Sequence, residues 1–141
     1  MGVQHNIEIA RTLLDGIGGG RDPAEIAAPF AEDLVFGIQG DDGVMPWIGR
    51  KTGRKAMIDF VRELRTLTEP LTFDVEDILA SETRAAIVGF LQTRIKATGK
   101  ITATQFALIV TVAHGVVVRF QMLEDSFDLS RAARLPAMRQ I

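Results

Sequence analysis

The chain has no cysteine and no tyrosine, only one tryptophan and only two histidines among its 141 residues. Without cysteine it can form no disulfide and offers no thiolate for nucleophilic or metal chemistry. The histidines, His5 and His114, lie far apart in the sequence and belong to no HExxH motif. Because metal sites need clustered ligands at characteristic spacings, we expect neither a metal nor another cofactor.

The sequence also lacks an excess of positive charge and has no long apolar run. Lysine and arginine number 16 against 18 acidic residues, which gives a net charge of −2. Nucleic-acid-binding surfaces are usually basic, so we expect no nucleic-acid partner. No stretch approaches the roughly 18 consecutive apolar residues of a membrane helix, and Glu8 and Arg11 interrupt the first apolar segment, unlike a secretion signal. These absences favour a cytoplasmic protein with no membrane contact, and the length favours one domain over residues 1–141.

Three helices are expected in the N-terminal half. Apolar residues at helical spacing predict an amphipathic helix over residues 3–17, which the glycine run 18–20 ends. That run follows a helix and not a strand, so we interpret it as a flexible connector and not as a phosphate loop. Asp22 and Pro23 predict the start of a second helix, reaching about Phe30. Thr52 is expected to cap the third helix, and Glu69-Pro70 to end it.

Strand patterns occupy most of the remaining chain. Residues 33–38 predict a first strand and residues 71–79 a second, with Leu71, Phe73 and Val75 alternating against polar neighbours. From residue 86 to 96 the odd positions carry the more apolar side chains. From residue 116 to 125 the even positions, Val116 to Glu124, form the more apolar face. Helices followed by antiparallel strands predict an α+β fold: three helices over a strongly curved sheet with a dry interior.

Several phrases carry a more specific resemblance. They are FAED at 30–33, MPWIGR at 45–50 with TGR at 52–54, ATGK at 97–100, HGVV at 114–117, RF at 119–120 and ED at 124–125. With the order of elements, they resemble the NTF2-like superfamily, and within it the SnoaL-like or ketosteroid-isomerase-like group. The resemblance implies an NTF2-like cone with a curved, mainly antiparallel sheet. It does not imply one activity, because members include enzymes and domains that only bind.

The acid–base residues that the resemblance implies are absent at the matched positions. The base of the steroid isomerases falls at about Ile38, and the chain has no tyrosine to stabilise an enolate. The arginine and aspartates of the epoxide hydrolases fall near Gly89, Leu91 and Met122, and Met122 also replaces a carboxylate of the cyclases. The sequence therefore predicts a domain that binds a small molecule in an apolar pocket.

An enzyme remains the alternative, as an isomerase, polyketide-cyclase-like or epoxide-hydrolase-like protein that uses another carboxylate. Asp125 could act as a base, although a helix cap is the simpler interpretation. Asp41 in the loop could do so too, but Asp-Asp-Gly is typical of an ordinary turn. Arg94 is expected to face solvent or a second copy. A third possibility is a dimeric interaction module without a ligand.

The predicted ligand site follows from the strand faces and the aromatic residues. Trp47 could either cover the edge of the core or form a wall of the pocket mouth. The residues expected to line or approach the cavity are Phe36, Ile38, Trp47, Phe60, Leu91, Phe106, Leu108, Phe120, Met122 and Asp125. The expected ligand is small and hydrophobic or aromatic. The outer sheet face mixes small apolar side chains with Gln105, Arg119 and Gln121, and relatives commonly pair through it, so we expect a homodimer.

Overall fold

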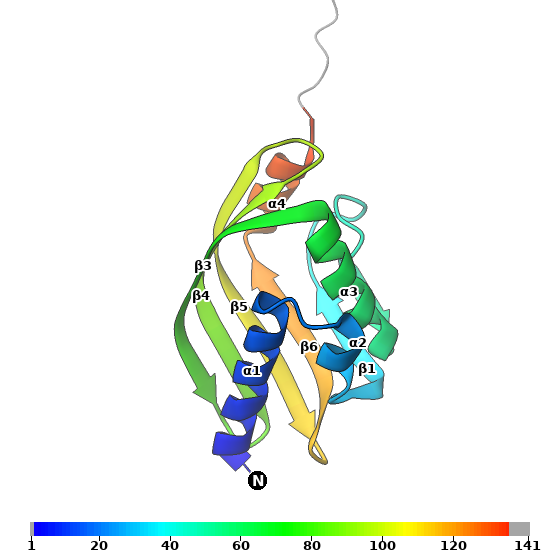
Figure 1. The fold of residues 1–141 in the computed structure, drawn as a ribbon, viewed down its shortest axis with the longest axis vertical. Coiled ribbons are helices and arrows are strands. Elements are labelled where there is room, and N and C mark those ends of the chain that lie inside the picture. Colours follow the sequence, from blue (N-terminus) through cyan, green and yellow to red (C-terminus); the bar gives the residue numbers. More distant parts are fainter. Residues whose placement is uncertain (1, 136–141) are drawn as a thin grey trace, which may run out of the picture.

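The computed structural model describes residues 2–135 and has the α+β architecture that the sequence predicts. Helices α1, α2 and α3 lie on one side of a curved sheet, and α4 closes one end of it (Figure 1). The elements are α1 (Gly2–Gly18), α2 (Pro23–Ala27), β1 (Phe30–Ile38), β2 (Gly49–Thr52), α3 (Arg54–Leu67), β3 (Thr68–Ala80), β4 (Arg84–Ile95), β5 (Ile101–Ala113), β6 (Val116–Glu124) and α4 (Ser126–Ala133). The sequence FDLSRAARLPAM at 127–138 also predicts a short terminal helix or tail, of which residues 136–138 lie outside the described residues.

One sheet carries all six strands of the described chain, in the order β2-β1-β6-β5-β4-β3. The β1–β6 pair is parallel and the other pairs are antiparallel, which confirms a mainly antiparallel sheet. On its concave face, α1 packs against β3 and β4, and α3 packs against β1. The core lies between these layers.

The helix starts follow local chemistry with one exception. Asp22 caps α2 by accepting a hydrogen bond from the Ala24 amide, and Pro23 takes the first helical position, as predicted. The predicted end of the second helix at about Phe30 is wrong, because α2 ends at Ala27 and Phe30 begins β1. The prediction that Thr52 caps the third helix is wrong. Thr52 instead ends β2, a strand that sequence patterns did not indicate, and Gly53 at φ 109° precedes the helix without a side-chain cap. Four residues are enough for this strand because they pair with the end of β1.

The glycine connector between α1 and α2 is held by the third helix. Arg65 of α3 donates hydrogen bonds to the carbonyl oxygens of Gly16, Ile17 and Arg21. These include carbonyls in the last turn of α1, where a cation interacts favourably with the helix dipole. The glycine run therefore joins two helices, and the carbonyls that flank it bind a guanidinium group, which is not the geometry of a phosphate loop.

The predicted strand faces are confirmed on β4 and corrected on two other strands. In β4 the odd positions Ala85, Ile87, Gly89, Leu91 and Ile95 are buried. In β6, Phe120 is buried and Met122 packs against the core, but a register shift against β5 buries Val117 and exposes Val116. An inserted residue changes which neighbours face the core, and a strict alternation cannot show it.

Strand β3 departs most from its alternating pattern. Two register shifts interrupt its pairing with β4, between Pro70 and Thr72 and between Val75 and Asp77. Phe73 pairs with Leu91, so it lies on the concave face, yet it is 49% exposed. Leu79 pairs with Ala86 on the outer face and is exposed too. The expected dry face of β3 is therefore partly open to solvent, since β3 is an edge strand.

The close approach of β3 to β4 at Gly89 generates a stability prediction. A Cβ atom on Gly89 would lie 2.0 Å from the carbonyl oxygen of Asp74, whereas one on Gly37 would meet nothing within 4 Å. We expect Gly89→Ala to lower the free energy of unfolding by about 1–3 kcal/mol, because the strands must separate. Gly37→Ala, the matched control, should be neutral or stabilising by about 0.5–1 kcal/mol. Urea denaturation measures both, and equal effects would contradict the assignment of Gly89 as a close-contact position.

Candidate functional site

Aromatic rings fill one half of the interior. The rings of Phe36 and Phe120 stack with centroids 5.3 Å apart, and Phe60 packs on both at 5.6 and 5.8 Å. Trp47 meets Phe60 edge to face at 5.7 Å and is only 4% exposed. Such contacts stabilise a core beyond the area that they bury. The indole of Trp47 is therefore part of the packed core in this structure.

The other apolar residues of the predicted site lie on the concave face of the sheet. Ile38, Leu91, Phe106 and Leu108 are buried, and Met122 is partly buried against the core. Their positions agree with an interior location. Whether any of them touches a ligand stays a prediction.

The carboxylates proposed from sequence are engaged elsewhere. Asp125 accepts a hydrogen bond from the Asp128 amide and caps α4, the simpler of its two interpretations. Asp41 is an exposed side chain whose pKa is held below its usual range by hydrogen bonds from Arg134 and Ser130. Arg94 pairs with Glu69 on the protein surface. None of these three groups is placed to transfer a proton inside the cone.

Glu124 is a carboxyl group that faces the interior, unlike the three groups above. It pairs with Phe106 across the β5–β6 ladder, and directly opposed residues share a face of the sheet. The side chain is partly buried. Burial, together with the negative charge of Asp125, raises the pKa of Glu124 from 4.5 to about 7. Desolvation penalises the charged form of a carboxyl group in this way.

The ring of Phe106 leans away from Glu124. It stacks on Phe73 with centroids 4.9 Å apart, and its Cε1 atom lies 3.1 Å from where a Gly89 Cβ would be. Since β4 and β3 lie on the opposite side of β5 from β6, the ring extends away from β6. The absent side chain of Gly89 makes room for it. Consequently Phe106 does not cover the carboxyl group that it opposes in register.

The end of the sheet near Glu124 is closed by α4 and the loop of residues 39–48. Asp128 of α4 accepts hydrogen bonds from the Ala103 amide and the Thr102 hydroxyl of β5. Ser130 and Arg134 bind Asp41 of the loop. Figure 1 shows α4 at the end toward which β6 points. Glu124 therefore lies beneath a cap that two separate chain segments build.

Within the described residues, no group of three histidine, cysteine, aspartate or glutamate side chains is arranged to hold a metal ion. The same part of the chain contains no helix long and apolar enough to cross a membrane.

Comparison with known families gives one match that spans most of the chain. The model of the SnoaL-like domain matches residues 10–120. The chain belongs to the SnoaL-like domain family. The match ends at residue 120, so it assigns nothing to Glu124. No curated protein matches the chain.

Solved structures similar to this SnoaL-like domain share its fold. An NTF2-like protein from Burkholderia xenovorans is 25% identical, with a TM-score of 0.84 over 95% of this chain and 99% of that one. Another, from Burkholderia thailandensis, is 18% identical, with a TM-score of 0.79 over 96% and 100%. A protein of ketosteroid isomerase-like fold from Catenulispora acidiphila, in complex with trimethylamine, is 15% identical, with a TM-score of 0.72 over 92% and 95%. The NTF2-like cone predicted from the sequence is thus confirmed.

The sequence pattern of the last strand already indicates that Glu124 points inward. On β6 the even positions that point inward end with Phe120, Met122 and Glu124, so an acidic residue lies on an otherwise apolar face. The bases expected from the sequence are Asp125, which follows it, and Asp41, and Glu124 is not among them. One of the matched catalytic positions falls at Met122, and Glu124 lies one inward position further along the strand.

A raised pKa at Glu124 makes stability depend on pH. Because the folded state holds this proton more tightly than the unfolded chain, the stabilisation is complete below pH 4.5 and is lost as pH rises through about 7. We expect the free energy of unfolding to fall by up to about 3 kcal/mol over this window. Glu124→Gln should remove the loss, whereas Glu76→Gln, on exposed β3, should retain it. Urea denaturation from pH 5 to 8 measures this; parallel curves for wild type and Glu124→Gln would contradict it.

Proposed function

We propose that this SnoaL-like domain binds a small apolar or aromatic molecule on the concave face and that Glu124 transfers a proton to or from it. The observation that carries the proposal is an interior carboxyl group at the end of β6, beside Met122 and opposite Phe106. Proton transfer needs an ionisable group within reach of the substrate, and Glu124 meets that requirement where Asp41 and Asp125 do not.

The surroundings of Glu124 support an apolar substrate. Phe106, Leu91 and Met122 share its face of the sheet, and the half-exposed ring of Phe73 extends that surface to the edge strand. Ligand sites of this kind combine apolar walls with one or two polar groups that orient the ligand. The remaining predicted residues, Phe36, Ile38, Trp47, Phe60, Leu108 and Phe120, would support these walls from within the core.

The protonation of Glu124 supports proton transfer over binding alone. At neutral pH a carboxyl group with a pKa of about 7 is present in both its acid and its base form. General acid–base catalysis is most effective when the pKa of the group lies near the working pH. An isomerisation or cyclisation that moves one proton next to a carbonyl group would suit a single such residue. In this proposal Glu124 takes the role of the acid–base residue that the sequence suggested for Asp41 or Asp125.

We propose further that two copies pair through the outer face of β4, β5 and the C-terminal end of β6, a contact that leaves Arg119 and Gln121 of β6 accessible. A shallow hollow of about 460 Å³ includes Val88, Gln105, Ala107 and Leu123 of the outer face in its lining, together with Glu76, Gly89, Phe106 and Glu124. Leu123 is 44% exposed. Exposed apolar side chains around a hollow are typical of an interaction surface, and a second copy would bury the same patch on each partner.

The exchange of ketone α-protons in D₂O tests the role of Glu124. With cyclohexanone as the probe, we expect proton NMR to show an exchange rate that rises with pH to a half-maximum near pH 7. Glu124→Gln should lower the rate about 10²–10⁴-fold. Asp125→Asn keeps a helix-capping side chain and should retain exchange, with its midpoint shifted to lower pH because one negative charge is gone. Exchange by wild type and Glu124→Gln at equal rates would overturn the proposal.

The assembly is tested by the mass in solution. Light scattering at micromolar concentrations should give twice the chain mass for the wild type. Ala107→Arg should give the monomer, because it places a charge in the hollow, whereas Ala97→Arg in the exposed β4–β5 hairpin should leave the dimer intact. A monomeric wild type would refute pairing through this face.

A further inference from the structure

A second hollow lies on the outer face, on the side of the sheet where β2, β1 and β6 run together. It has a volume of about 300 Å³. The side chains around it include Arg50 of β2 and Arg119 of β6, with Gln39, Gln121 and Asp42. This groove is separated from Glu124 by the thickness of the sheet, because Arg119 and Gln121 alternate with the inward-facing Phe120 and Met122.

Gly37 forms the floor of the groove. It pairs with Arg50 on one side and with Gln121 on the other. A Cβ atom on Gly37 would meet no other atom within 4 Å, so the space above it is open. A larger residue at this position of β1 would fill the hollow between the two arginine-bearing strands. The hollow therefore depends on a missing side chain.

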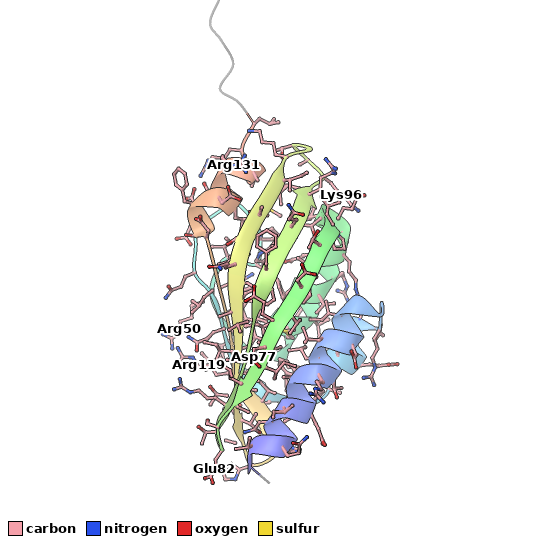
Figure 2. All side chains as sticks on the ribbon, turned by 90° about the vertical axis from the view of Figure 1, so that its left-hand side faces the viewer. Arg50, Asp77, Glu82, Lys96, Arg119 and Arg131 are labelled. Atoms are coloured by element: carbon pink, nitrogen blue, oxygen red, sulfur yellow. The ribbon has the colours of Figure 1, made fainter. Side chains whose placement is uncertain are left out.

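Two guanidinium groups border this open space. Figure 2 shows Arg50 and Arg119 together, both directed away from the helices. Both are exposed, and neither forms an ion pair among residues 2–135. Their Cα atoms lie two strands apart, roughly 10 Å across the sheet, so two long side chains can approach one ligand above Gly37. Other arginines, such as Arg94, Arg131 and Arg134, are paired with carboxylates.

The chemistry of the groove favours an anion with several oxygen atoms. Guanidinium groups bind phosphate and carboxylate through paired N–H donors, and the amides of Gln39 and Gln121 add further donors. Asp42 offsets one of the two positive charges, so the groove keeps a single excess positive charge before a ligand enters. The volume holds a phosphate group together with a small substituent.

We propose that the groove formed by Gly37, Arg50, Arg119 and Gln121 binds the phosphate group of a small molecule. The two arginines contact the phosphate oxygens from opposite sides of β1, and Gly37 lets the ligand approach the backbone of the sheet. Binding here is independent of proton transfer at Glu124, because the two sites lie on opposite faces.

Titration of ¹⁵N-labelled protein with inorganic phosphate and with phenyl phosphate, at constant ionic strength, tests the proposal. We expect saturable amide shifts at Gly37, Arg50 and Gln121. Arg50→Gln and Arg119→Gln should each weaken binding at least tenfold. Gly37→Leu, which keeps every charge but fills the hollow, should weaken it as much. Tighter binding of phenyl phosphate would identify an ester ligand, and equal binding would identify the phosphate group alone; both support the site.

The matched control is Arg84→Gln, which changes the net charge equally at an exposed position at the start of β4. It should change the affinity less than twofold. The proposal is overturned if Arg84→Gln weakens binding as much as Arg50→Gln does, or if Gly37→Leu binds phosphate like the wild type. Either result would mean general attraction to positive charge and not a built site. Unsaturable shifts in the wild type would overturn it as well.

Discussion

The close contact between Asp74 and Gly89 is the constraint on which the shape of the sheet depends. A side chain at Gly89 would collide with the Asp74 carbonyl oxygen, and register shifts interrupt the β3–β4 pairing nearby. Glycines and bulges are the features that let a sheet bend sharply. Gly89 also gives space to the ring of Phe106, which crosses β4 to stack on Phe73. The bend and the aromatic packing thus have one local cause.

This arrangement determines which side chains line the interior, where a ligand could contact them. One half is filled by the packed rings of Phe36, Phe60 and Phe120 with Trp47. The ring of Phe106 on β5 turns away from Glu124, which opposes it in register at the end of β6, two residues before α4 begins. A carboxyl group in such apolar surroundings holds its proton to about pH 7. The fold therefore places one reactive group against an apolar surface.

Sequence patterns predicted most of the elements but not the insertions. Periodicity placed the helices, the long strands and the buried face of β4, because these segments repeat regularly. It missed β2, whose four residues are too few for a pattern, and the register shifts of β3 and β6, which depend on pairing between strands. Glu124 was on the inward face by its spacing. Its importance could not be judged without the packing that partly buries it and raises its pKa.

The most direct test of the account is the titration of the Glu124 carboxyl carbon, followed by ¹³C NMR and assigned with Glu124→Gln. The account predicts a midpoint near pH 7 in the free protein, and a midpoint that moves when an apolar ketone binds on the concave face. A midpoint near 4.5, unchanged by any such ligand, would mean that Glu124 is an ordinary solvated carboxylate, and it would contradict the central claim.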